Sequence, residues 1–144
     1  MKLTTMRFGE IEIDQSSIIA FPQGIPGFEE DKRFVVLRPD QDIPFSFLQS
    51  VDHGEISFLI TNPFWFYKDY EFDLPENEQV KLKVGQKEDL EIWSIVTIKD
   101  DINQATLNLQ APVIINDKEK LGMQVILHDT NYQTKHKLLR QNGA

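Results

Sequence analysis

The hydrophobic and polar positions of this chain alternate in short runs that end at turn sequences. Residues 8–14 place Phe8, Ile11 and Ile13 between acids, with one break in phase at Gly9. An apolar residue at every second position is typical of a strand with one buried face, and glycine at the break favours a bulge. The same reasoning predicts strands at residues 18–21, 34–37, 45–51, 58–60, 90–98, 105–111, 113–115 and 123–127.

One segment has the pattern of a helix. Pro75 stands at a first-turn position, acids follow it, and Gly85 provides a stop. A helix of about ten residues needs tertiary support, so we expect Leu74, Val80 and Val84 to pack against the sheet. Many short strands and one short helix predict an all-β fold. We expect a single-domain, partly open antiparallel β-barrel over all 144 residues.

The densest group of aromatic residues lies in residues 57–74. Asn62 and Pro63 end a strand there, because proline removes a hydrogen-bond donor and disfavours helix in the residue before it. Four consecutive aromatic residues follow at 64–67. An element with two faces cannot bury all of them, so we expect at least one ring near the surface. Two interpretations stay open: a loop packed on the core, or the edge of a binding surface.

The charge of the chain bears on its partners. Fifteen basic and 23 acidic residues leave a formal net charge of −8. Proteins that bind nucleic acid usually carry a basic surface, because neutralising phosphates supplies much of the affinity. We therefore expect no direct contact with nucleic acid. The charge suits a basic protein partner, whose encounter rate it would raise, although solubility alone also accounts for it.

Composition and apolar runs bear on the compartment. The chain has no cysteine, which excludes disulfides and thiolate metal sites and fits a reducing compartment. It also has no signal-peptide-like run near its N-terminus and no stretch with the length of a membrane span. We expect a cytoplasmic protein that does not contact membranes and is a monomer on its own.

No group of residues indicates catalysis. His53 falls in a predicted turn, where we expect a solvated side chain. His128 and His136 are eight residues apart, a spacing that matches no compact metal motif. Ser57 could be combined with His128 and Asp129, but it lacks the strained Gly-x-Ser-x-Gly turn of a hydrolase nucleophile. We expect no enzymatic activity, no metal and no cofactor.

Six motifs occur in a fixed order over nearly the whole chain. They are FPQGIPGF at 21–28, TNP at 61–63, DYEFDL at 69–74, NLQAPVIIN at 108–116, GMQVIL at 122–127 and DTNYQTKH at 129–136. Together they resemble FliW, a family of bacterial flagellar assembly factors. The one departure is Lys137, which replaces the proline expected after His136.

The resemblance implies a small non-enzymatic binding protein with a partly open β-barrel fold. Members of this family bind CsrA, a basic RNA-binding repressor of translation, and keep it from flagellin messenger RNA. They also bind flagellin, and its secretion frees them to capture CsrA. By this resemblance, the chain couples flagellin translation to secretion. Whether the two partners share a surface, and whether CsrA is blocked by occlusion or at a distance, stays open.

The candidate binding residues follow from how protein interfaces gain their energy. A few aromatic anchors ringed by polar residues carry most of it. The candidates are Asn62, Pro63, Phe64, Trp65, Phe66, Tyr67, Asp69, Tyr70, Glu71 and Asp73, then Asn108 and Gln110 on a predicted strand, and Asn131 and Tyr132 near the C-terminus. A second function also stays open, because small β-barrels bind single-stranded RNA by stacking bases on exposed rings.

Overall fold

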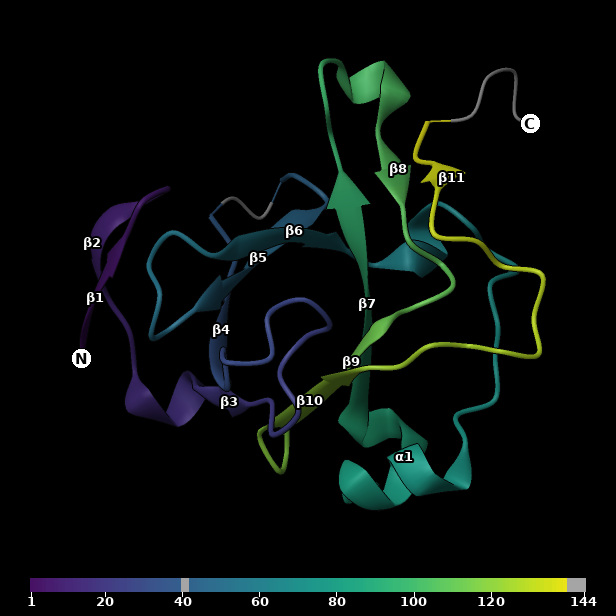
Figure 1. Ribbon diagram of the computed structural model, residues 1–144, viewed down its shortest axis with the longest axis horizontal. Helices are drawn as coiled ribbons and strands as arrows, with labels where there is room; N and C mark the ends of the chain where they lie inside the picture. The colour runs from purple at the N-terminus through teal and green to yellow at the C-terminus, as the bar shows by residue number, and fades with distance from the viewer. Residues whose placement is uncertain (40–41, 140–144) are drawn as a thin grey trace.

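The computed structural model describes residues 1–39 and 42–139, and a curved 9-stranded sheet makes up most of it (Figure 1). The strands of this sheet are β3 (Ile19–Ala20), β4 (Arg33–Leu37), β5 (Phe45–Ser50), β6 (Ser57–Thr61), β7 (Leu90–Thr97), β8 (Thr106–Leu107), β9 (Val113–Asn116), β10 (Leu121–Gln124) and β11 (His136–Lys137). Two further strands, β1 (Lys2–Thr5) and β2 (Gly9–Glu12), form a separate hairpin. The α-helix α1 (Glu76–Lys81) lies between β6 and β7 in the chain.

The sheet curls until β9, one of its end strands, pairs with β7. β7 pairs with β6 along one edge and with β9 along the other, and the strands from β6 through β5, β4, β3 and β10 lead back to β9. The ladders within the described residues are antiparallel except one contact of β10 with β3, where Leu121 faces Ala20. The predicted all-β fold with one short helix is therefore confirmed as a strongly curved, mainly antiparallel sheet.

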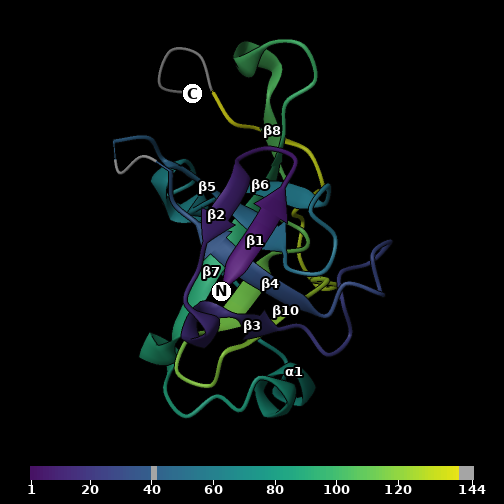
Figure 2. The same ribbon diagram turned by 90° about the vertical axis from the view of Figure 1, so that its left-hand side faces the viewer.

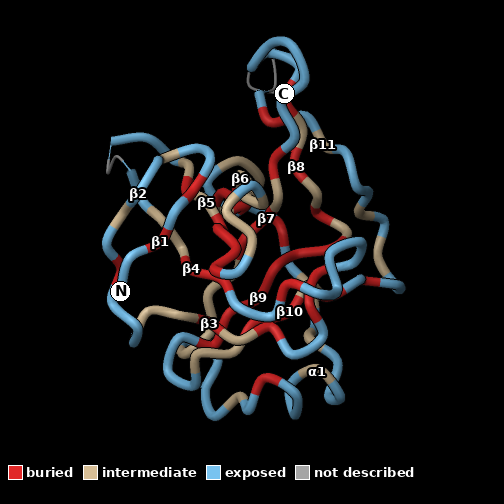
Figure 3. The backbone as a smooth tube through the Cα atoms, turned by 60° about the vertical axis from the view of Figure 1, so that its left-hand side comes forward, coloured by how far each residue is buried: buried red, intermediate tan, exposed pale blue. Residues whose placement is uncertain are grey.

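The core fills the inside of the curl (Figure 3). Its fully buried apolar side chains include Phe21, Phe34, Leu48, Ile60 and Val113. Alternation along the strands explains this set, because every second side chain of a strand points to the same face. Burying each of these side chains favours folding by roughly 1.5–3 kcal/mol, before the cost of chain entropy.

Two predicted strands differ in the structure. The segment 8–14 contributes only Gly9–Glu12, and its partner is Lys2–Thr5, a strand that the pattern did not reveal. The segment 105–111 is paired only at Thr106–Leu107. Its later backbone groups bond elsewhere. The Gln133 carbonyl accepts from the amides of Leu109 and Gln110. The Asn108 side chain accepts from the Ala111 amide.

The predicted helix exists, but Val80 was assigned to the wrong face. Its side chain is 71% exposed, whereas Leu82, just past the end of α1, is 1% exposed and packs in the core. The helix has only six residues, so the turn at its end, rather than the helical repeat, directs Leu82 inward. Leu74 and Val84 pack beside Leu82 as predicted.

The two ends of the described chain lie on opposite sides of the sheet (Figure 1). The hairpin β1–β2 faces the viewer in Figure 2, packed through Leu3 and Ile13 on Val35 and Val51. The tail from residue 134 adds β11 to β8 and buries Leu138. Among the described residues, no helix has the length and apolarity to cross a bilayer.

Candidate protein-binding surface

The path of the chain after β6 is set by Asn62 and Pro63. The Asn62 side chain accepts a hydrogen bond from the Phe64 amide at 2.9 Å and so caps a short 3₁₀ helix, Pro63–Trp65. Pro63 is buried at the first position of that helix, where its missing N–H costs nothing. This turn lifts the chain out of the sheet and leaves Phe64 38% and Trp65 61% exposed.

The next two rings turn inward. Phe66 stacks on Phe45, with ring centroids 6.4 Å apart. The Tyr67 hydroxyl donates to the Lys137 carbonyl oxygen at 2.5 Å, so this half-buried ring holds the tail. The run of four aromatic residues is thus divided into two outward and two inward rings. The prediction that at least one ring lies near the surface is confirmed.

Tyr70 was predicted as a surface anchor, but its side chain is only 4% exposed. Its hydroxyl donates to the Leu109 carbonyl at 2.8 Å, and its ring meets Tyr132 edge to face at 4.8 Å. Burial raises the pKa of the Tyr70 hydroxyl. A side chain held in this way positions the segment and does not present a ring to a partner.

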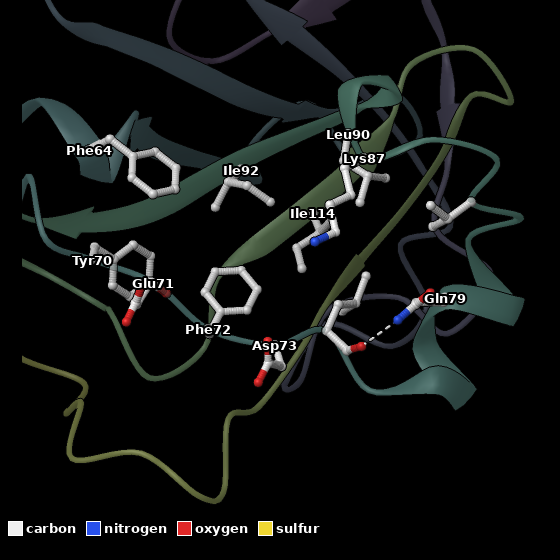
Figure 4. Close-up of a pocket in the computed structure, with 12 residues that line it drawn as sticks. Phe64, Tyr70, Glu71, Phe72, Asp73, Gln79, Lys87, Leu90, Ile92 and Ile114 are labelled. Atoms are coloured by element: carbon white, nitrogen blue, oxygen red, sulfur yellow. Dashed lines mark hydrogen bonds between the residues drawn. The ribbon is translucent and has the colours of Figure 1, made fainter.

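A groove of about 370 Å³ lies between the segment 70–74 and strands β7 and β9 (Figure 4). Phe64, Phe72, Ile92 and Ile114 are among its apolar lining residues. Phe72 and Leu74 are half-buried, whereas the alternating acids are exposed at the rim of the groove or beside it; these acids are Asp69, Glu71 and Asp73. The groove therefore combines an apolar floor with two carboxylates, Glu71 and Asp73, and one cation, Lys87.

The remaining candidates lie near the tail. Asn108 and Gln110 are half-buried, and the Gln110 amide donates to the Gln133 carbonyl. Tyr132 is half-buried beside Tyr70, and its hydroxyl accepts from the Glu71 amide at 3.1 Å. Asn131 is exposed. The structure thus brings Tyr132 and the backbone of Gln110 to the aromatic segment (residues 64–72), and it leaves the Asn108 side chain in a turn.

His136 also belongs to this surface, although it was not among the candidate binding residues. Its ring lies 5.6 Å from that of Tyr67 and 6.2 Å from that of Tyr132, and its Nε2 accepts from the Gln133 amide at 2.8 Å. Burial lowers the pKa of His136. The available signal was the alternation of His136 and Leu138 with exposed residues, which is too short to predict a strand.

A second group of polar residues lies on the hairpin side of the molecule. Asp31 is 3% exposed, and its carboxylate accepts from the Ser50 hydroxyl at 2.7 Å and faces His53 Nδ1 at 2.7 Å. The hydrogen bond to Asp31 raises the pKa of His53. His53 was predicted to be simply solvated, and this pairing corrects that view. Asp31, Ser50 and His53 are called the polar cluster below.

The structure does not assemble the chemistry that the sequence left as minor alternatives. Within residues 1–39 and 42–139, no three His, Asp or Glu side chains are placed to hold a metal ion together. His128 and Asp129 are exposed beside a hollow that Glu71 and Asp73 also line, whereas Ser57 lies on β6. Ser57 is therefore not part of the site that contains His128.

The model of a protein family described as "FliW protein" matches residues 2–138. The chain belongs to the FliW family. It is 44% identical to the flagellar assembly factor FliW of Alkaliphilus metalliredigens, over 98% of this chain and 88% of that protein. The flagellar assembly factor FliW of Geobacillus thermodenitrificans is also 44% identical, over 100% and 99% of the two chains.

A solved structure agrees with this assignment. A crystal structure of the flagellar assembly factor FliW superimposes with a TM-score of 0.93 at 42% identity, covering 99% of both chains. The resemblance predicted from six short motifs is thereby confirmed over the matched residues. The aromatic segment and the groove beside it are therefore parts of a flagellar assembly factor of the FliW family.

Proposed function

We propose that this flagellar assembly factor acts in the cytoplasm, without catalysis, as a protein-binding antagonist of the translational repressor CsrA, and that it also binds flagellin. The observation that carries the proposal is the exposed pair Phe64 and Trp65 beside an apolar groove rimmed by carboxylates. Exposed aromatic residues in such a setting are typical anchors of protein interfaces. The net charge of −8 supports a basic partner such as CsrA.

The aromatic segment is held firmly enough to act as a preformed surface. Tyr67 bonds the tail, Tyr70 bonds the Leu109 carbonyl, and Asn62 caps the turn. Because these contacts fix the backbone before a partner arrives, less conformational entropy is lost on binding. The exposed acids add long-range attraction, which raises the association rate more than the final affinity.

Exchange of two partners requires comparable affinities. A tenfold preference corresponds to about 1.4 kcal/mol, so a modest fall in free flagellin would be enough to change the partner that is bound. When flagellin is scarce inside the cell, this protein binds CsrA and keeps it from messenger RNA. When flagellin accumulates, it occupies this protein, and CsrA is free to bind messenger RNA. If CsrA is inhibited at a distance, the coupling between RNA and this protein is reciprocal.

The decisive variant is Trp65→Ala, since this side chain is exposed and its loss leaves the core intact. We expect a loss of at least about 2 kcal/mol in affinity, roughly 30-fold, for CsrA, flagellin or both. Val80→Ala is the control, because Val80 is also an exposed apolar residue but lies on α1. Isothermal calorimetry with each purified partner measures the effect, and equal affinities for both variants would contradict the proposed surface.

Single-stranded RNA is the alternative ligand that the exposed rings allow. Titrating RNA at low salt and again at higher salt distinguishes the two functions, because the phosphate contacts of a single-stranded RNA binder weaken steeply as salt is added. The proposal expects no RNA binding by the protein alone. It also expects flagellin to displace CsrA from a preformed complex, which co-purification followed by competition would show.

A further inference from the structure

The two halves of β7 are paired differently. Ser94 and Ile95 pair with β6, whereas residues 90–93 pair only with β9 on the opposite edge. β6 stops at Thr61, because Asn62 then caps the 3₁₀ helix that turns the chain away. Figure 1 shows β7 continuing toward α1 after β6 has ended. Within the described residues, no strand pairs with this side of residues 90–93, which we call the open edge, although the 3₁₀ helix Pro63–Trp65 contacts β7.

Neighbouring hydrogen bonds identify which backbone groups point to the open edge. On the β8–β9 side, the Asp89 carbonyl accepts from the Asp117 amide at 3.3 Å. On the same side, the Ile95 carbonyl accepts from the Asn108 amide, just after β8, at 3.0 Å. Successive residues of a strand direct their N–H and C=O groups to alternate edges. Leu90 and Ile92 therefore direct theirs to the open edge.

Within the part of the chain that the structure describes, three of these four groups have no hydrogen-bond partner. The Leu90 amide donates to the Lys87 carbonyl at the end of a 3₁₀ helix, Lys87–Asp89. No turn, loop or side chain of residues 1–39 and 42–139 bonds the Leu90 carbonyl or the amide and carbonyl of Ile92. Unpaired groups in a row along a strand are a template for another strand.

The surroundings of the open edge are apolar and electrically balanced. A hollow of about 480 Å³ beside it is lined by residues 90–93 together with Phe64 and Trp65. Arg38, which also lines this hollow, lies 5.7 Å from the Trp93 ring and 3.9 Å from the Glu91 carboxylate, so this cation is paired. This differs from the groove between the segment 70–74 and strands β7 and β9, which Glu71 and Asp73 line.

We propose that the open edge of β7 binds an extended, uncharged segment of flagellin as an added β-strand; this inference rests on the proposed function. The backbone of the segment would bond Ile92 and the Leu90 carbonyl, and its alternate side chains would contact Phe64 and Trp65. Strand addition gains affinity from main-chain hydrogen bonds and specificity from the flanking pockets. The edge is electrically balanced, whereas Glu71 and Asp73 line the neighbouring groove, so we assign the basic CsrA to the groove and flagellin to the edge.

Amide hydrogen exchange followed by NMR tests the open edge residue by residue. In the free protein, we expect the Ile92 amide to exchange rapidly, while the Glu91 and Trp93 amides, bonded to β9, exchange slowly. Saturation with monomeric flagellin should slow exchange at Ile92 by at least tenfold. The two neighbouring amides serve as internal controls, since global stabilisation would slow all three together.

The outcomes separate this inference from the proposed function. If calorimetry shows that flagellin binds while Ile92 exchange is unchanged, strand addition is wrong and the proposed function stands. If flagellin does not bind, the flagellin part of the proposed function and the strand addition both fail. Slow exchange at Ile92 in the free protein would show a covered edge and overturn the inference, as would protection of Ile92 by CsrA instead of flagellin.

Discussion

The polar cluster and the aromatic segment lie on opposite sides of the sheet, and they use their functional groups in opposite ways. In the polar cluster, the buried Asp31 carboxylate is satisfied by Ser50 and His53. In the aromatic segment, Phe64 and Trp65 remain exposed, although their neighbours Tyr67 and Tyr70 are fixed by hydrogen bonds. A site whose groups are satisfied internally supports the fold, whereas a rigid site with exposed rings is prepared for a partner.

The largest expected effect comes from removing the centre of the polar cluster. Asp31→Ala leaves the buried Ser50 hydroxyl and the His53 ring without their acceptor, so we expect a loss of about 3 kcal/mol in the free energy of unfolding. Urea denaturation measures it. Asp52→Ala is the control, since its ion pair with Arg33 is exposed and should contribute under about 1 kcal/mol. Equal losses in the two variants would contradict the structural role of Asp31.

A smaller effect is expected from Tyr70→Phe. This change keeps the ring but removes the hydroxyl that donates to the Leu109 carbonyl. A lost buried hydrogen bond of this kind costs about 1–2 kcal/mol of stability. Affinity for CsrA and flagellin should change less than in Trp65→Ala, because the Tyr70 ring is buried. A large loss of affinity with unchanged stability would instead place Tyr70 in the interface.

Stability should hardly respond to Trp65→Ala. The ring is 61% exposed, and substitutions at exposed positions usually change the free energy of unfolding by about 0.5 kcal/mol or less. Thermal and urea unfolding of this variant therefore serve as the control for its binding defect. A loss comparable to that of Asp31→Ala would show that the two regions do not differ as described.

The pKa values of the two histidines should be shifted in opposite directions from the ordinary value. Asp31 raises the pKa of His53, so the stability that His53 contributes is complete below its ordinary pKa of 6.5 and is lost as pH rises through the folded-state pKa. Burial lowers the pKa of His136, so stability falls as pH drops below 6.5 toward its folded-state pKa. NMR titration of the ring protons should place the two midpoints on opposite sides of 6.5.

Local sequence patterns were sufficient for much of the fold. Alternation located most strands, and the Asn62–Pro63 turn was predicted because both residues act on their immediate neighbours. The errors arose where distant residues decide. Tyr70 is buried by Leu109, 39 positions away, and His53 is paired with Asp31, 22 positions away. Val80 was misplaced because a six-residue helix ends before its repeat can determine the buried face.

The candidate site was predicted in part for the same reason. The exposure of Phe64 and Trp65 follows from local chain geometry, since four rings in a row cannot all be buried. The open edge of β7 depends on where β6 stops relative to a strand 29 or more positions later. The hydrogen bond from the Tyr67 hydroxyl to the Lys137 carbonyl joins residues that are 70 positions apart. No pattern within one segment reports such contacts.

The contact of β3 with β10 has a consequence for synthesis of the protein. The Ala20 amide donates to the Lys120 carbonyl, so β3 gains this partner only after the chain as far as β10 has been made. Until β10 has left the ribosome, the rings of Phe21 and Phe34 lack their final cover. A nascent chain that has not yet reached β10 therefore has an open, apolar interior, and chaperones would meet it in that state.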